Sequence, residues 1–311
     1  RLRAASAAVS NPAWHPPGLV GPLGGAVASA KVLGLDTHLT QMAMGIAASR
    51  TGGLTANTGT MVKSTHTGNA ARMGAEAAIL ASEGYTSNDS IFEAPNGYSE
   101  ALFNGNLDLE ILTQGLGTSF RLVEPGFDIK RFPAQVYMQN SIEAVLDLRQ
   151  QHDLRADMVD HLTIQMRGRG HSGPLPLSGL DGKFSVEYCA AAALLDGQVG
   201  IETFTDQRRF STDMQETLRK ISVEPGDPES SAVRATAQLK DGSTVDSECH
   251  AFRGSAANPM SRGERMAKVF DCVQRVLSQQ DTERLLSLLE NLENVADISE
   301  VMEILGQLPR R

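Results

Sequence analysis

The chain has few cysteines, and their spacing suits neither a metal site nor a disulfide framework. The three cysteines Cys189, Cys249 and Cys272 are widely separated, and no two of them form a Cys-x-x-Cys motif. An odd number with this spacing indicates reduced thiols and predicts a cytoplasmic location, with the mitochondrial matrix as the alternative in a eukaryote. An iron–sulfur cluster needs three or four thiolates that meet in space, and the spacing does not indicate one.

The sequence also lacks a long apolar run and an excess of basic residues. Its longest apolar run covers residues 189–195, whereas a membrane-spanning helix needs about 20 residues. The formal net charge of −9 argues against nucleic acid and against an anionic membrane surface as partners. The length of 311 residues, 41% of them hydrophobic, suffices for one large domain or two ordinary ones.

The most informative segment that is present covers residues 59–72. It places Lys63 and His66 three residues apart in a Gly- and Thr-rich stretch, which predicts a loop running into an Ala-rich helix over residues 68–82. A lysine, a histidine and the positive end of a helix together can hold an anion such as a carboxylate. The alternative is that Lys63 is an ordinary solvated surface residue.

Three further segments accompany this one in a fixed order. They are residues 14–21, with a histidine between a tryptophan and two prolines; residues 128–139, with Lys-Arg-Phe-Pro-Ala near their start; and residues 182–190, which open an apolar helix. Together with the Lys63 segment, their order and spacing resemble the MmgE/PrpD family. That family includes 2-methylcitrate dehydratases, cis-aconitate decarboxylases and iminodisuccinate epimerases. The resemblance runs from about His15 to the C-terminus. It indicates the family strongly but says much less about which of the family's reactions is catalysed.

The resemblance implies four catalytic residues. It places a catalytic histidine at His15, a substrate-binding lysine at Lys63, a lysine that reaches the substrate across a domain cleft at Lys130, and a proton donor at Tyr188. Without the family, each has a plainer interpretation. His15 is then a packed histidine, the lysines are surface cations, and Tyr188 is a core residue of an apolar helix.

Four further residues are expected to bind the substrate, and no metal is expected among them. His66 lies at the family's usual spacing from the lysine, although it could instead bond the loop to the helix. Gly68 allows close backbone approach, and Arg72 is either a second carboxylate contact or a surface residue. Gln139 occupies a position where family members carry Gln or His. Tyr137 stands where some dehydratases of the family have a histidine, and a phenol with an unperturbed pKa of about 10 is a poor substitute for that base.

The hydrophobic periodicity predicts a mainly α protein with an α+β module. Residues 1–126 and 262–311 are expected to form an all-helical domain built from both chain ends, and residues 127–261 are expected to form an α+β lid domain. The family resemblance implies the same arrangement. Further expected helices are 20–33, 39–49, 91–103, 107–116, 141–151, 186–195, 266–277, 282–292 and 298–305, and the expected strands are 159–167, 232–239 and 244–252.

The beginning of the chain has neither an initiator methionine nor an apolar signal core, and residues 1–9 resemble the end of a helix. Members of the family carry a helical region before this point, which includes an Asp and a His of the active site. The resemblance therefore implies that the N-terminal part of the helical domain is missing from the sequence.

The predicted function is that of a cofactor-independent lyase acting on a small di- or tricarboxylate. Elimination of water, as in 2-methylcitrate dehydratase, is the first hypothesis; decarboxylation of cis-aconitate, epimerisation, or a catalytically inert carboxylate-binding protein are the alternatives. Negative charge develops next to a carboxylate in the enzymatic routes, so we expect Lys63 and Lys130 to face one cleft from different domains and stabilise it. His15 would transfer the proton.

The helices expected over residues 19–30 and 39–49 carry small and apolar residues around more than half of their circumference. One partner helix cannot cover so much surface. The sequence therefore predicts a homodimer formed through the helical domain, as the family resemblance also implies.

Overall fold

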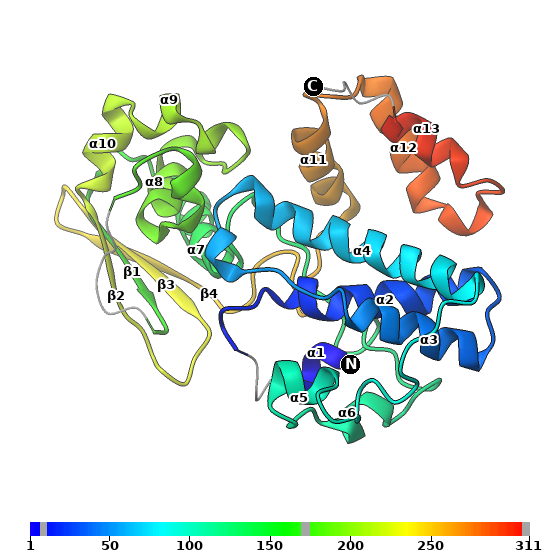
Figure 1. Cartoon of the computed structure of the whole chain (residues 1–311). Coiled ribbons are helices and arrows are strands. Elements are labelled where there is room, and N and C mark those ends of the chain that lie inside the picture. The colour runs from blue at the N-terminus through cyan, green and yellow to red at the C-terminus, as the bar shows by residue number, and fades with distance from the viewer. Residues whose placement is uncertain (7–10, 169–174, 307–311) are drawn as a thin grey trace. The chain divides into compact units, whose positions relative to one another are not determined.

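The computed structural model describes residues 1–6, 11–168 and 175–306. Its internal contacts divide the chain into two compact units, Arg1–Glu124 and Pro125–Arg311 (Figure 1). The mainly α composition with an α+β module is confirmed. In this division the helices after residue 262 fall in the second unit, and their membership of the helical domain stays a prediction.

The regular elements described in the first unit are helices. The three longest, α2 (Pro16–Val32), α3 (Thr37–Ala48) and α4 (Met61–Ser82), pack against one another. Small residues make this approach close, since a Cβ added at Gly74 would lie 2.5 Å from the backbone nitrogen of Ala26. The shorter elements are α1 (Leu2–Ala5), η1 (Thr55–Asn57), α5 (Tyr98–Phe103) and α6 (Leu109–Thr113).

Two of these helices, α2 and α4, begin at least one helical turn earlier than the sequence pattern predicts. The prediction that α4 starts near Gly68 is wrong, because the helix already begins at Met61 with Thr60 as its N-cap. Its first turns contain Ser, Thr and Gly, whose intrinsic helix propensity is low, but packing of the face that carries His66 and Ala70 overrides it. The helix α2 starts at Pro16, where a proline needs no hydrogen-bond acceptor in the first turn.

The second unit contains a four-stranded mixed sheet with the order β2-β1-β3-β4. The strands β3 (Val233–Leu239) and β4 (Thr244–Cys249) form the predicted antiparallel hairpin, and β3 also pairs antiparallel with β1 (Val159–Met166). The strand β2 (Ile221–Pro225) pairs in parallel with β1 and was not predicted. It is five residues long and ends in a proline, so the alternation of Ile221 and Val223 with Ser222 and Glu224 is too short to be recognised from the sequence.

Helices cover one face of this sheet and bury the largest core of the molecule. The helix α7 (Gln139–Gln151) packs on β3 and β4, and α8 (Val186–Asp196) packs on α7 and β2 (Figure 1). The connection between β1 and β2 carries α8, as a parallel pair requires a crossover. The remaining elements are η2 (Val136–Met138), η3 (Leu180–Phe184), η4 (Glu202–Phe204), α9 (Asp206–Arg209), α10 (Thr212–Leu218), α11 (Arg262–Val273), α12 (Gln279–Glu290), η5 (Leu292–Asn294) and α13 (Ser299–Gly306).

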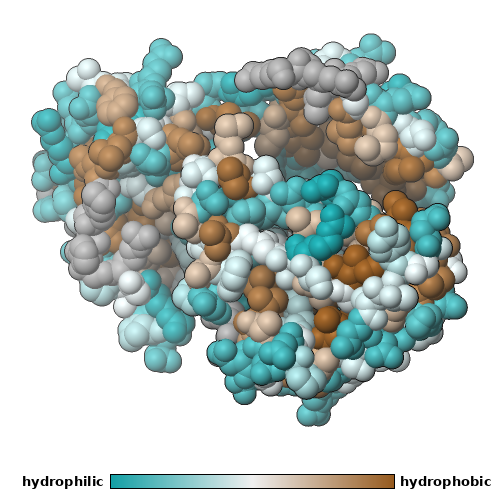
Figure 2. Space-filling model, in the orientation of Figure 1, coloured by the Kyte–Doolittle hydropathy of each residue, from teal (hydrophilic) through white to brown (hydrophobic). Residues whose placement is uncertain are grey.

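The surface is chemically mixed. On the face drawn in Figure 2, hydrophobic patches lie among hydrophilic side chains. Large apolar side chains that are well exposed include Val32 and Met61 in the first unit, with 87% and 89% of their area accessible. Within residues 1–6, 11–168 and 175–306, none of the helices combines the length and the apolar character that crossing a membrane would take.

Candidate functional site

His15 is held at the start of α2 by the backbone. It occupies the N-cap position, and two prolines follow at the first helical positions. Its backbone nitrogen donates to the carbonyl oxygen of Gly53 over 2.9 Å, and Trp14 forms an isolated antiparallel bridge with Leu54. Because the segments around residues 14 and 54 are joined in this way, main-chain bonds fix the backbone from which the His15 ring extends.

Glycines allow these two segments to meet. Gly52 donates its N–H to the carbonyl oxygen of Gly18 over 3.0 Å, and a Cβ added at Gly18 would lie 1.9 Å from the Gly52 oxygen. Gly53 has a φ of +141°, which side chains rarely adopt. The N–H of Gly52 is therefore bonded within the protein.

His66 and Lys63 come to this corner from α4. They are three residues apart in a helix, so both lie on the same side of α4. The Nδ1 atoms of His15 and His66 are 3.0 Å apart, and the two ring centroids are separated by 5.1 Å with planes tilted by 50°. His66 is buried with 8% of its area accessible, whereas His15 is half-buried. The first unit therefore brings three of the predicted site residues together.

The electrostatic surroundings favour the neutral form of His15. Burial of the ring lowers the pKa of His15 below its ordinary value of 6.5, and the electrostatic effects of Lys63 and of the neighbouring His66 lower it further. A neutral imidazole beside a cation suits proton exchange with a bound carboxylic acid near neutral pH.

The other two predicted residues of α4 lie in different surroundings. Gly68 is exposed, and a Cβ added there would meet no atom within 4 Å, so local space does not require a glycine. Arg72 donates to Glu76 over 2.8 Å, and Arg50 donates to the same carboxylate over 2.5 Å. The structure thus places Arg72 in a surface ion pair, and its substrate contact stays a prediction.

In the second unit, the segment around Phe132 is tied together by two predicted residues. Lys130 is exposed, and its Nζ donates to the carbonyl oxygen of Ala134 over 3.1 Å. Gln139 is fully buried; its Oε1 accepts from the backbone nitrogen of Phe132 over 3.0 Å and its Nε2 donates to the oxygen of the same residue over 3.2 Å. The amide of Gln139 therefore holds the chain that carries Lys130.

Tyr188 lies in the core of the second unit. Its side chain is fully buried, and its hydroxyl donates to the carbonyl oxygen of Thr203 over 2.5 Å. Burial raises the pKa of Tyr188 to about 12, so the phenol is neutral at physiological pH and can donate a proton but not act as a base. Its predicted role as a proton donor is therefore compatible with its charge state and remains a prediction.

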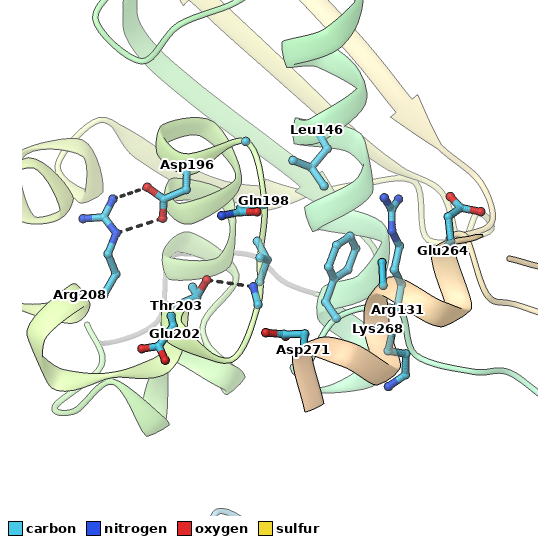
Figure 3. Close-up of a pocket in the computed structure, with 15 residues that line it drawn as sticks. Arg131, Leu146, Asp196, Gln198, Glu202, Thr203, Arg208, Glu264, Lys268 and Asp271 are labelled. Carbon is cyan, nitrogen blue, oxygen red and sulfur yellow. Dashed lines mark hydrogen bonds and ion pairs between the residues drawn. The ribbon is translucent and has the colours of Figure 1, made fainter. Parts of the chain in front are cut away.

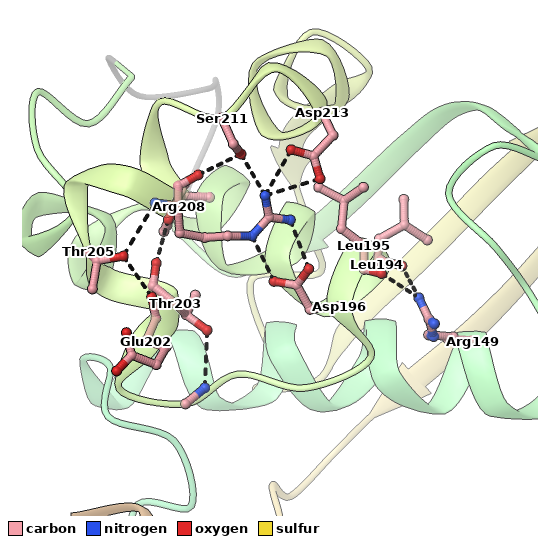
Figure 4. A network of polar contacts seen from close by, with 12 residues as sticks. Arg149, Leu194, Leu195, Asp196, Glu202, Thr203, Thr205, Arg208, Ser211 and Asp213 are labelled. Atoms are coloured by element: carbon pink, nitrogen blue, oxygen red, sulfur yellow. Dashed lines mark hydrogen bonds and ion pairs between the residues drawn. The ribbon is translucent and has the colours of Figure 1, made fainter. Parts of the chain in front are cut away.

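A network of ion pairs fastens the segment that accepts this hydroxyl (Figure 4). The guanidinium of Arg208 donates to Asp196 through two nitrogens, over 2.8 and 3.0 Å, and to Asp213 over 2.9 Å. Arg149 donates to the carbonyl oxygens of Leu194 and Leu195 at the end of α8. The bonds of Arg208 join α8, α9 and α10, and those of Arg149 join α7 to α8.

The sequence interpretation missed a buried ion pair next to Lys130. The carboxylate of Glu143, with 3% of its residue area accessible, accepts from Arg131 over 2.9 Å. Burial raises the pKa of Glu143, and the charge of Arg131 opposes this shift. The signal that could have found this pair is a glutamate on the apolar face of the helix predicted over residues 141–151.

A pocket of about 450 Å³ opens beside this pair (Figure 3). Residues from α7, from the segment 196–203 and from α11 line it, and Asp271 accepts there from the backbone nitrogen of Ile201 over 3.1 Å. None of the eight predicted site residues lines this pocket, and carboxylates stand among its cations: Arg131, Asp196, Glu202, Arg208, Glu264, Lys268 and Asp271. We assign no substrate to it. In the described part of the chain, no three side chains of the types His, Cys, Asp and Glu gather to hold a metal ion.

Comparison with known proteins places the chain in a family. The model of the MmgE/PrpD N-terminal domain matches residues 1–110, and that of the MmgE/PrpD C-terminal domain matches residues 132–294. The chain is 29% identical to the cis-aconitate decarboxylase of Homo sapiens over 289 residues, which cover 89% of this chain and 60% of that protein.

Other relatives agree. The cis-aconitate decarboxylase of Mus musculus is 29% identical over 289 residues, covering 89% of this chain and 59% of that protein. The one from Aspergillus terreus is 27% identical over 261 residues, covering 76% of this chain and 53% of that protein. The chain thus spans between one half and three fifths of the length of these relatives. By its matches to both domain models, the chain belongs to the MmgE/PrpD family.

Proposed function

We propose that the protein is a lyase that removes CO₂ from cis-aconitate or from a closely related tricarboxylate. The observation that carries the proposal is the convergence of His15, His66 and Lys63 in one corner of the first unit. The relatives are cis-aconitate decarboxylases by name, which supports the decarboxylase alternative better than the dehydration that we hypothesised first from the sequence. Tyr137, which stands where some dehydratases have a histidine, supports the same choice.

The chemistry follows from these side chains. When the bond to the leaving carboxylate breaks, its electron pair passes into the remaining unsaturated acid, where negative charge develops. Lys63 strengthens its interaction with the substrate as this charge grows, so it stabilises the transition state more than the ground state. His15, after taking up a proton from solvent as its imidazolium, donates this proton to carbon, and the product carries one carboxylate fewer than the substrate.

The second unit is proposed to supply two further groups. Lys130 would act as a second cation for the substrate carboxylates, and Tyr188 as a proton donor. Both roles rest on the family resemblance. The neutral state of the buried phenol supports the second of them. Gln139, Gly68 and Arg72 are proposed substrate contacts on the same basis.

The experiment that tests the proposal incubates the protein with cis-aconitate labelled with ¹³C in its carboxylates and follows the sample by NMR. We expect labelled CO₂ or bicarbonate and a product with one carboxylate fewer. Parallel samples contain 2-methylcitrate and citrate. Formation of a new alkene from 2-methylcitrate without release of CO₂ would favour the dehydratase hypothesis. Calorimetric binding of the acids without turnover would identify an inert carboxylate-binding protein.

We also propose that the protein forms a homodimer through its helical unit. Exposed apolar side chains on α2 and α4, with Val32 and Met61 the most exposed, support this proposal. A stable interface of this kind buries more than about 1,000 Å². Light scattering that shows a monomer at micromolar concentration would contradict it.

A further inference from the structure

We propose that His66 is a positioning residue: its Nδ1 accepts the Nδ1–H of His15 and so fixes the tautomer in which the Nε2 of His15 exchanges a proton with the substrate. The catalytic role of His66 rests on the proposed function, whereas the hydrogen bond and its direction can be measured without turnover. It starts from the distance of 3.0 Å between the two Nδ1 atoms.

At that distance the two nitrogens must share one proton. If both carried hydrogen, the two N–H groups would point at each other; if neither did, two lone pairs would face each other. A hydrogen bond therefore requires one protonated and one unprotonated Nδ1. Since a neutral imidazole carries its proton on only one nitrogen, the neutral pair consists of one ring protonated at Nδ1 and one protonated at Nε2.

The direction of this bond decides whether His15 can cycle its proton. Suppose that His66 donates. A neutral His15 then carries its own proton on Nε2, and releasing that proton would leave an imidazolate. Suppose instead that His15 donates. The ring then alternates between imidazolium and a neutral form protonated at Nδ1, and only its Nε2 gains or loses a proton. The bond to His66 is intact in both states, so the second arrangement fits an acid that is used repeatedly.

The surroundings keep His66 in place for this task. A Cβ added at Gly53 would lie 3.2 Å from the Nδ1 and 3.3 Å from the Cγ of His66, so the ring packs directly on the backbone of that glycine. The same glycine accepts the backbone N–H of His15. Gly53 therefore lies against the His66 ring and also holds the backbone of His15. Lys63, on the same side of α4, lowers the pKa of His15 and so makes its imidazolium a stronger acid toward the substrate.

Two substitutions of His66 distinguish whether its side chain serves as a hydrogen-bond acceptor or only fills space. In His66→Asn the side-chain oxygen can take the place of Nδ1 and accept from His15. In His66→Leu a similar volume remains, but no acceptor does. We expect His66→Leu to reduce kcat/KM for the proposed substrate by about 100-fold, which is the lower end of the usual effect of losing general acid–base catalysis. The kcat/KM of His66→Asn should stay within about 10-fold of the wild-type value. His38→Asn, in an exposed position of α3, is the matched control and should leave it unchanged.

The measurement that does not need turnover is ¹⁵N NMR of the histidine rings in the 311-residue protein, assigned with the His15→Asn and His66→Asn variants. We expect a protonated Nδ1 on His15 and an unprotonated Nδ1 on His66. A protonated Nδ1 on His66 overturns the proposal, as does full activity of His66→Leu. If no substrate is turned over but the ring nitrogens show the expected pattern, the proposed function fails while the hydrogen bond from His15 to His66 stands.

Discussion

The two units treat their predicted site residues differently. In the first unit, the polar atoms of His15 and His66 face each other, and Lys63 acts on the His15 ring through its charge. In the second unit, the polar atoms of Gln139 and Tyr188 are bonded to main-chain carbonyls or N–H groups of the same unit. The side chains of the first unit thus interact with one another, whereas those of the second unit bind and hold the backbone of their own unit.

This difference has a physical consequence for function. A group bonded to the backbone must give up that bond before it can bond to a substrate, and a net hydrogen bond contributes about 1 kcal/mol. Lys130 lies on an exposed segment, so giving up its bond to the carbonyl oxygen of Ala134 does not disturb the core. Fully buried Gln139 and Tyr188 cannot do so without disturbing the core. We therefore expect substitutions of His15, His66 and Lys63 to change rates, and substitutions of Gln139 and Tyr188 to change stability.

The largest expected effect tests the first half of this comparison. Lys63→Ala should lower kcat/KM for the proposed substrate by about 100- to 1,000-fold, which corresponds to roughly 3 kcal/mol of lost transition-state stabilisation. The melting temperature should hardly change, because Lys63 contributes charge and not core packing. Lys31→Ala, an exposed lysine of α2, is the matched control. A Lys63→Ala protein with the wild-type rate would return Lys63 to the role of a solvated surface residue.

The second prediction concerns the backbone that holds His15. Gly18→Ala should lower the free energy of unfolding by about 2 to 3 kcal/mol, because the new Cβ lies 1.9 Å from the carbonyl oxygen of Gly52 and one segment must move. Gly24→Ala provides the contrast in the same helix. No atom lies within 4 Å of its Cβ position, so alanine should raise stability by about 0.5 to 1 kcal/mol.

Urea unfolding curves measure both variants. Equal stability of Gly18→Ala and the wild type would mean that the two segments separate easily, and that His15 is not fixed by its neighbours. In that case the comparison between a preassembled first unit and a structural second unit would no longer hold.

The third prediction tests whether Gln139 has a structural role, that is, whether it holds the backbone of Phe132. In Gln139→Leu the backbone N–H and C=O of Phe132 lose their side-chain partner inside the protein. An unsatisfied buried group costs about 1 to 3 kcal/mol, so we expect a loss of about 2 kcal/mol in the free energy of unfolding. Gln150→Leu, at an exposed position of α7, should change it by less than about 0.5 kcal/mol. Wild-type stability of Gln139→Leu, together with a large increase in KM, would show a substrate contact instead.

Sequence patterns predicted regular, periodic elements well and the local environment of single side chains poorly. The hairpin β3–β4 and the helices α3 and α8 were found because alternation, helical spacing and turn residues agree there. The start of α4 was missed because packing outweighed the low helix propensity of its first turns. The family motif identified His15 and His66, but their shared proton depends on a contact between residues 51 positions apart. No local pattern encodes such a distance.

The smallest expected effect concerns Tyr188, where the two roles of a residue can be separated. Tyr188→Phe keeps the ring in the core and removes only the hydroxyl, so the carbonyl oxygen of Thr203 loses its donor. We expect the free energy of unfolding to fall by about 1 kcal/mol, the usual net value of one hydrogen bond. Tyr137→Phe, in an exposed position of the same unit, is the control and should show no measurable change.

The rate of the Tyr188→Phe protein then decides between a structural role of the hydroxyl and a catalytic one. A change of 1 kcal/mol in stability leaves nearly all of a folded protein folded, so it cannot by itself lower kcat by more than a small factor. A fall in kcat of about 100-fold or more, with KM unchanged, therefore requires that the hydroxyl donates a proton in the reaction. An unchanged kcat would show that the hydroxyl serves Thr203 alone and would confine the acid–base chemistry to His15 and groups outside the core of the second unit.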